Sequence, residues 1–304
     1  MRRGFGSAGL ALVGLAVAGL TACGGNDNGG AVRQLTPAHG PTGAPGALRA
    51  KVPAAIASAG ALRVAVSVGR PPMLFFATGT KQLEGVEYDL MQAVGREFGL
   101  PVQMVETSPD QLGLSLGSRA DVFISGVADL KSLQAAGIDF VDYAAGSSAT
   151  LVRRGDPTQV KSPAGVCGKR VGVVVGTAQQ VVLATLTRDC TSRGRPAPTV
   201  EAGRDHAALL ASLLAGQLDT IVDDAVVAQY TAEGSTGAAT VEVAGPVVDP
   251  LPYGIGVAKG DAALRDGVQA ALSAMLNDGS YGSALSHWGA DADALHAITV
   301  NTGP

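Results

Sequence analysis

Two side chains that can bind charged groups stand at the carboxyl ends of predicted strands. Thr177 follows a strand predicted over 170–175 and precedes a predicted helix, so its hydroxyl and the neighbouring N–H groups form a potential anion site. Asp224 ends another predicted strand, where its carboxylate can pair with an ammonium group. Both positions also suit the N-cap of the helix that follows, and position alone leaves the two roles open.

A second group of candidates lies earlier in the chain. Ser125 and Gly126 end a strand predicted over 121–125, where a hydroxyl and exposed backbone N–H groups can hold a carboxylate. Phe75 can form an apolar wall beside a bound molecule, although aromatic residues are more often part of a core. These residues together predict a polar binding site that has one apolar side.

The sequence offers little for catalysis or metal binding. Glu87 and Asp224 are the only plausible acid or base residues, and no Cys/His or Ser/His/Asp arrangement is visible. The histidines do not stand at metal-ligand spacing from another histidine or a cysteine: His39, His206, His287 and His296. We therefore expect no enzymatic activity, no metal and no cofactor. The net charge of −4 and the scattered basic residues argue against a nucleic-acid partner.

The N-terminal segment predicts export. Residues 1–22 have a charged start, an apolar run and a small-residue end, as a secretory signal peptide does. The apolar run over 10–20 is too short to span a membrane. The sequence Leu-Thr-Ala-Cys that ends at Cys23 resembles the bacterial lipobox, which implies an extracytoplasmic protein that is lipid-anchored to the cell membrane through Cys23. A free cysteine beside an ordinary signal peptide is the alternative.

The composition then changes. Residues 23–53 are rich in Gly, Pro and Ala without apolar periodicity, so they are predicted to form a flexible tether. The remaining residues, about 250, are enough for two lobes with cores of their own. Cys167 and Cys190 form an even pair in an exported chain, which predicts a disulfide. Two buried free thiols are the alternative.

Predicted strands and helices alternate twice along this head. The first series has strands over 62–68, 102–105 and 121–125, with helices over 88–98 and 112–116. The second has strands over 170–175, 199–201 and 219–223, with helices over 178–190 and 205–214 and one from 225. This alternation predicts an α/β fold with two lobes, each built on a parallel sheet covered on both faces. A ligand is expected in the cleft outside the carboxyl ends of the strands.

Seven short motifs stand in register along residues 60–290. They lie at 71–73 (Pro-Pro-Met), 83–90, 138–143, 168–177, 218–224, 252–257 and 277–289. Read in order, they resemble the bacterial solute-binding proteins of family 3, the binding proteins of polar amino acid importers. The resemblance implies a two-lobed periplasmic-binding-protein-like fold of type II, with two hinge crossings and a central ligand cleft. Residues 54–147 and 253–304 would form lobe 1, and residues 148–252 would form lobe 2.

The resemblance also implies a function. By this resemblance, the chain is expected to be the substrate-binding lipoprotein of an ABC importer. It would capture a small polar solute, an amino acid or an amino-acid-like molecule, by closure of its lobes. ABC permease subunits and the membrane would be its partners, and a monomer is expected. Two alternatives stay open: a sensor or partner-binding lipoprotein with a degenerate pocket, and a dehydratase-like enzyme on the same fold.

The binding site departs from the family pattern. Leu133 replaces the carboxylate-binding arginine of the family, and Ser67 stands where an aspartate is common. Arg70 occupies a turn where the family often has an aromatic residue. We hypothesise that Arg70 substitutes for the missing arginine, that Thr177 binds an anionic or polar end of the solute, and that Asp224 binds a cationic end. The alternative is that Arg70 points into solvent.

Overall fold

The computed structural model describes residues 45–234 and 240–304, so the predicted signal peptide and Cys23 lie outside the described residues. The strands are β1 (Leu62–Val66), β2 (Phe75–Phe76), β3 (Leu83–Glu84), β4 (Val102–Glu106), β5 (Val122–Phe123), β6 (Ile138–Arg153), β7 (Arg170–Val174), β8 (Thr199–Gly203), β9 (Thr220–Asp224) and β10 (Val241–Ala258). The helices are α1 (Ala54–Ala59), α2 (Val86–Phe98), α3 (Leu112–Ser115), α4 (Lys131–Ala135), α5 (Ala178–Ser192), α6 (His206–Leu214), α7 (Ala225–Glu233), α8 (Ala262–Asp278) and α9 (Ser280–His287).

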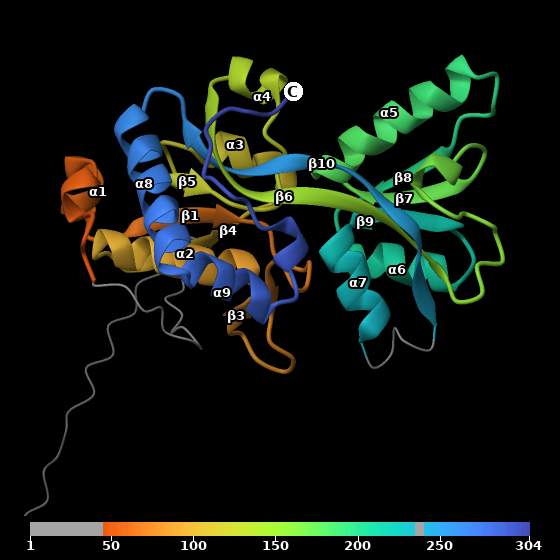
Figure 1. Cartoon of the computed structure of the whole chain (residues 1–304), viewed down its shortest axis with the longest axis horizontal. Helices are drawn as coiled ribbons and strands as arrows, with labels where there is room; N and C mark the ends of the chain where they lie inside the picture. The colour runs from red at the N-terminus through yellow and green to blue at the C-terminus, as the bar shows by residue number, and fades with distance from the viewer. Residues whose placement is uncertain (1–44, 235–239) are drawn as a thin grey trace, which may run out of the picture. The chain divides into compact units, whose positions relative to one another are not determined.

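Most of the strands form one mixed sheet in the order β4-β1-β5-β10-β6-β9-β7-β8. β1 is parallel to β4 and β5, and β7 is parallel to β8 and β9. β6 and β10 are antiparallel to each other and lie between these two parallel sets (Figure 1). The prediction of parallel strands is therefore right within each set and incomplete for the pair that joins them.

The two long central strands run through both halves of the sheet. β10 pairs with β5 through Gly256 and Val257 near its C-terminal end. β6 pairs with β9 through residues 148–151, near its own C-terminal end and thus in the other half of the sheet. β10 was not predicted as a strand. It contains Pro246, Pro250 and Pro252, and proline removes a hydrogen-bond donor from a ladder. The pairing accommodates them through register shifts between Ala244 and Val248 and between Val248 and Leu251.

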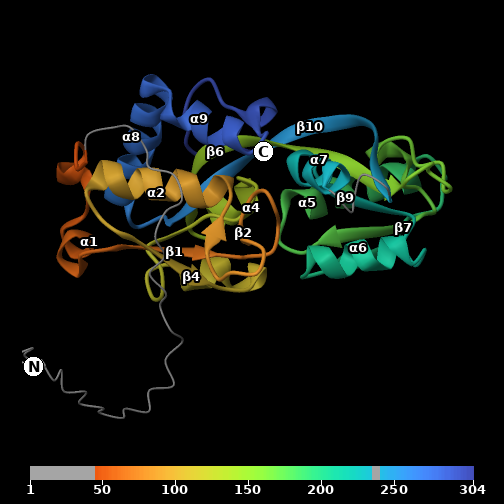
Figure 2. The same cartoon turned by 90° about the horizontal axis from the view of Figure 1, so that it is seen from below.

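Helices cover both faces of the sheet. In the second half, α5 packs on β7 and β9 from one side and α6 packs on them from the other (Figures 1 and 2). In the first half, α2 packs against α8 and α9, which follow β10 in the chain. The C-terminal segment therefore returns to the half that the N-terminal segment builds.

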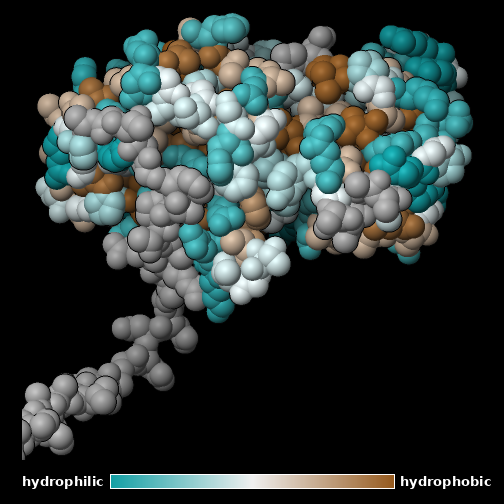
Figure 3. All heavy atoms as spheres, turned by 60° about the horizontal axis from the view of Figure 1, so that its bottom comes forward, coloured by the Kyte–Doolittle hydropathy of each residue, from teal (hydrophilic) through white to brown (hydrophobic). Residues whose placement is uncertain are grey.

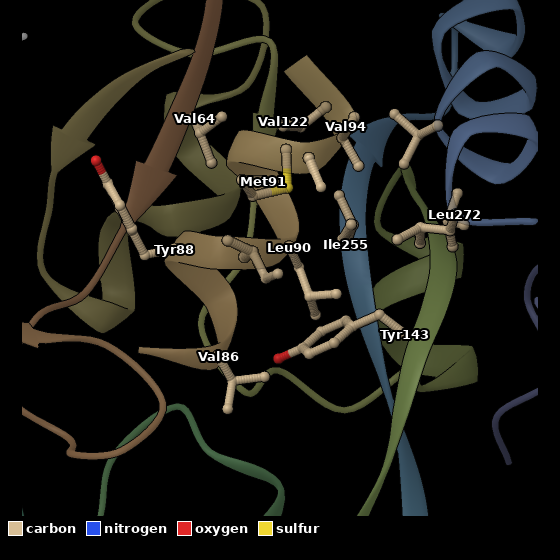
Figure 4. Close-up of a cluster of buried hydrophobic side chains, with 14 of the residues drawn as sticks. Val64, Val86, Tyr88, Leu90, Met91, Val94, Val122, Tyr143, Ile255 and Leu272 are labelled. Atoms are coloured by element: carbon tan, nitrogen blue, oxygen red, sulfur yellow. The ribbon is translucent and has the colours of Figure 1, made fainter. Parts of the chain in front are cut away.

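The largest buried core joins these two segments. Leu90, Met91 and Val94 of α2 have the predicted helical spacing and are fully buried. Ile255 of β10 and Leu272 of α8 belong to the same cluster (Figure 4). A fully buried side chain of this kind contributes about 1.5 to 3 kcal/mol. The contacts within this core thus hold chain segments together that are far apart in the sequence.

The predicted tether ends before residue 53. The N–H groups of Gly46 and Leu48 each donate a hydrogen bond of 2.8 Å to carbonyls in the last turn of α2. Val52 is buried in the large core. The prediction of a flexible tether is therefore wrong for residues 45–53, because their backbone and apolar groups find partners on the head.

A disulfide joins Cys167 and Cys190. It connects the segment before β7 to the last turn of α5, so the predicted pairing is confirmed and the alternative of two free thiols is wrong. In the chain-entropy model, closing a loop of this length stabilises the fold by on the order of 3 kcal/mol.

The surface of the head has mixed polarity. Figure 3 shows hydrophobic residues scattered among hydrophilic ones on one face. No helix within residues 45–234 and 240–304 is long and apolar enough to cross a membrane. Among the residues that the structure describes, the exposed large hydrophobic ones are Phe76, Leu114, Val200, Leu214, Tyr230 and Val247. Hydrophobic residues that are exposed singly are ordinary on a protein surface.

Candidate ligand-binding site

A narrow space lies where the loops after β1, β5 and β7 meet. Ser67 and Arg70 line it from the loop after β1, and Ser125 lines it from the loop after β5. Thr177 lines it from the opposite half of the sheet, just before α5. The structure thus brings together four of the seven residues that the sequence suggested, at the carboxyl ends of strands, where ligands of such sheets bind.

Arg70 points into the protein and is only 7% exposed, so the alternative of a solvent-facing Arg70 is wrong. Its Nη2 atom lies 3.9 Å from Oδ1 of Asp223 on β9. Burial by itself would lower the pKa of Arg70, but the nearby carboxylates of Asp223 and Asp224 outweigh burial, and the pKa is raised. The Nε and Nη2 atoms have no hydrogen-bond partner within the described part of the chain.

Gly126 makes room for this guanidinium. A Cβ atom at Gly126 would lie 2.7 Å from Nη1 of Arg70, and the φ angle of Gly126 is +58°. Both observations favour glycine, because another residue would clash with Arg70 and strain the backbone. The Gly126 N–H donates to the Tyr143 hydroxyl at 3.1 Å, and that hydroxyl donates to Oε1 of Glu87 at 2.7 Å. Burial raises the pKa of Glu87.

Asp224 is fully buried and both of its carboxylate oxygens have partners. Oδ1 accepts hydrogen bonds from the N–H groups of Val226 at 2.9 Å and Val227 at 3.2 Å, so Asp224 is the N-cap of α7. Oδ2 accepts a hydrogen bond of 2.6 Å from the Tyr253 hydroxyl. Burial raises the pKa of Asp224, and the charge of Arg70 opposes this shift. The capping role is thus present, and ammonium binding stays a prediction.

The Thr177 side chain does not cap α5, and its role in anion binding stays a prediction. Its hydroxyl donates a hydrogen bond of 2.7 Å to the carbonyl of Val174, and it makes no cap to α5. The N-cap alternative is therefore wrong for its side chain. The side-chain amide of Gln179, in the first turn of α5, donates a hydrogen bond of 2.6 Å to the Tyr253 hydroxyl. Sequence reasoning missed Gln179, which had no signal beyond its place in the first turn of a helix.

Asp223 and His206 form a buried pair that the sequence analysis also missed. His206 Nδ1 and Asp223 Oδ2 lie 2.8 Å apart, so the two side chains form an ion pair whenever His206 is protonated. Burial by itself would raise the pKa of Asp223, yet the neighbouring His206 and the charge of Arg70 outweigh burial and lower it. The two residues lie on different elements, α6 and β9, and no sequence motif links them. The one signal in the sequence was the pair of adjacent acids at 223 and 224.

Two further residues lie outside the space. The ring of Phe75 packs 5.6 Å from Trp288 and 6.2 Å from Tyr230, and Phe75 is not among the residues that line the space. Leu133 packs against an apolar cluster that contains Phe123. Position 133 therefore offers no guanidinium to a solute. Within the described residues, no cluster of three or more His, Cys, Asp or Glu side chains could hold a metal.

The buried carboxyl group of Asp293 is expected to make the stability of the fold depend on pH. Asp293 is 3% exposed, and burial together with the charge of Asp224 raises its pKa to about 7, although hydrogen bonds from Ser147 oppose the shift. Between about pH 4 and pH 7 the folded state keeps a proton that the unfolded chain loses, so this group lowers the unfolding free energy by up to about 1.4 kcal/mol per pH unit as the pH rises.

Asp293→Asn is therefore expected to remove this slope and to be more stable than the wild type at pH 8. The two proteins should differ least at pH 4. Urea unfolding from pH 4 to pH 8 measures the effect, and Asp291→Asn, at an exposed neighbouring position, is the control. Parallel pH profiles for the wild type and Asp293→Asn would contradict the prediction.

Comparison with known proteins identifies the family. Residues 62–291 match the model of the bacterial extracellular solute-binding proteins, family 3. The L-cystine-binding protein TcyA of Bacillus subtilis (strain 168) is 27% identical over 237 residues, which are 77% of this chain and 83% of that protein. The L-arginine-binding protein of Pseudomonas aeruginosa is 27% identical over 229 residues, 72% of this chain and 84% of the relative.

Solved structures of amino acid-binding proteins have the same fold. An ancestral arginine-binding protein bound to arginine is 26% identical, with a TM-score of 0.68 over 76% of this chain and 98% of that chain. An ancestral amino acid-binding protein that is a precursor of cyclohexadienyl dehydratase shares the fold, with a TM-score of 0.66, 24% identity and coverage of 77% and 97%. The family match and the two-part sheet together show that this chain belongs to the bacterial extracellular solute-binding proteins of family 3.

Proposed function

We propose that the chain is the solute receptor of an ABC importer and that it holds a small polar solute, an amino acid or an amino-acid-like molecule, in the space between the two halves of its sheet. One observation carries the proposal: Ser67, Arg70 and Ser125 from one half and Thr177 from the other line the same space. Its similarity to an L-cystine-binding protein and to an L-arginine-binding protein supports the same class of solute.

The proposed lobes are residues 54–147 with 253–304, and residues 148–252. The long strands β6 and β10 cross from one lobe to the other, and their pairing shifts register near 248–254. Such irregularities are places where a strand can bend. Closure around a solute would bring Arg70 and Thr177 to opposite sides of it, and a permease could sense the closed form. A monomer suffices for this role.

Thermal unfolding with a panel of amino acids and their analogues tests the proposal. A solute present at a hundred times its dissociation constant should stabilise the fold by about 2.7 kcal/mol and raise the Tm by roughly 5 to 10 °C. Ser125→Phe should abolish the shift because it fills the space. Ser132→Phe, at an exposed position on α4, is the matched control.

The panel also separates the alternatives. Stabilisation without chemical change of the solute supports a receptor, and disappearance of the solute would support an enzyme on the same fold. If no solute shifts the Tm, solute capture is contradicted in favour of a sensor or partner-binding role. We propose no catalytic step, because Glu87 and Asp224 are each held by a tyrosine hydroxyl and neither is among the residues that line the space.

We further propose that the mature protein is a lipoprotein held outside the cytoplasm on the cell membrane through Cys23. The lipobox-like sequence supports this anchor. Two or three acyl chains anchor a protein firmly, since each buried CH2 group contributes about 0.8 kcal/mol.

A further inference from the structure

The charge of Arg70 matters most for the kind of solute that this site accepts. Its guanidinium lies against Gly126 and near the buried carboxylates of Asp223, Asp224 and Glu87. The position where an ammonium group was expected, beside Asp224, therefore already has a positive charge from the protein itself. A solute cation would have to enter beside this buried guanidinium, and two like charges repel strongly where water is excluded.

The carboxylates near Arg70 already have neighbours within the protein. Asp224 accepts from two N–H groups and from the Tyr253 hydroxyl, as described above. Glu87 accepts from the Tyr143 hydroxyl, and Asp223 has His206 and the Asp224 N–H as neighbours. Asp223 Oδ2 has no hydrogen-bond partner among the described residues, but it faces His206 at 2.8 Å. None of the three carboxylates lines the space in which a solute would bind.

The donors of Arg70, in contrast, are not satisfied. Nε and Nη2 are buried without a hydrogen-bond partner in the described part of the chain, and leaving buried polar groups unpaired is costly. Arg70 lines the narrow space together with Arg204, the hydroxyl residues Ser67, Ser125 and Thr177, and several apolar or glycine positions. No aspartate or glutamate lines it within the described residues. The first turn of α5, a helix of fifteen residues, also begins at this space.

We propose that the solute is a small carboxylic acid without an ammonium group, and that its carboxylate accepts hydrogen bonds from Nε and Nη2 of Arg70. In this assignment Arg70 supplies both the carboxylate-binding group that Leu133 cannot supply and the positive charge that an amino acid would bring. The inference rests on the proposed function and narrows the class of amino-acid-like solutes.

Calorimetry on the full chain with matched pairs of acids tests the inference. The pairs are alanine with lactate, glutamate with 2-hydroxyglutarate, and phenylalanine with phenyllactate, with pyruvate and 2-oxoglutarate added. The members of each pair differ only at the amino group. We expect at least one deaminated acid to bind tenfold or more tightly than its amino acid partner, because Arg70 and the ammonium group repel.

The second measurement is the affinity of the variant Arg70→Gln for the same solutes. The substitution should weaken binding of that acid by at least tenfold, because a charge-assisted bidentate contact is lost. It should also strengthen binding of the matched amino acid, since the positive charge beside Asp224 is gone. Arg188→Gln, which removes an exposed guanidinium on α5, is the control. Circular dichroism and the Tm check that each variant is folded.

The outcomes separate the two proposals. If the wild type binds an amino acid more tightly than its deaminated partner, or if folded Arg70→Gln binds the acid as the wild type does, the inference is wrong and solute capture stands. If neither class of solute binds the wild type, solute capture is contradicted and the inference with it.

Discussion

Gly146→Ala is expected to lose more than about 4 kcal/mol of unfolding free energy together with solute binding. Gly146 lies on β6, and a Cβ atom there would be 1.9 to 2.4 Å from three ring atoms of Tyr253. That ring is fully buried and cannot move without loss of its hydrogen bonds to Asp224 and Gln179. Overpacking costs about 1 to 3 kcal/mol, and each buried polar group left unpaired costs about 1 to 3 kcal/mol more.

Urea unfolding of the wild type and the variant measures this loss, and calorimetry measures binding. Gly282→Ala is the matched control, because a Cβ atom there meets nothing within 4 Å and the position lies inside α9. The control is expected to gain up to about 1 kcal/mol, since alanine favours a helix over glycine. A Gly146→Ala protein as stable as the wild type would show that Tyr253 can shift without cost.

Cys23→Ser is expected to move nearly all of the protein from the membrane fraction to the medium. Serine has no thiol to accept a lipid, and the head has no membrane-spanning helix among its described residues to replace the anchor. Membrane fractionation of cells that express each protein measures the change. The Tm of the released head should equal that of the wild type, because Cys23 precedes the residues that make up the folded head.

The double variant Cys167→Ala, Cys190→Ala separates the lipid from the disulfide. It removes the other two cysteines of the chain and should stay with the membrane. If the wild type itself is found in the medium, residues 1–22 act as an ordinary signal peptide. Equal membrane fractions for the wild type and Cys23→Ser would also reject the anchor.

Much of the fold follows from local patterns. The apolar spacing of α2, the valine-rich strands and the turn residues between them depend on neighbours in the sequence, so the alternating α/β elements could be predicted with ends that differ by a few residues. The rule that ligands bind outside the carboxyl ends of strands also pointed to the loops that meet at the candidate site. β6 and β10 could not be predicted as continuous strands, because partner strands and register shifts decide their pairing across several prolines.

The sequence by itself therefore determined the class of fold, the pairing of Cys167 with Cys190 and the loops that carry Ser67, Ser125 and Thr177. Only the tertiary structure decided what the charged residues do. It turned Arg70 inward beside Asp223 and set His206 on the other side of that carboxylate. These contacts join residues far apart in the chain, and their energies depend on burial and on distances of a few ångströms, which no local pattern encodes.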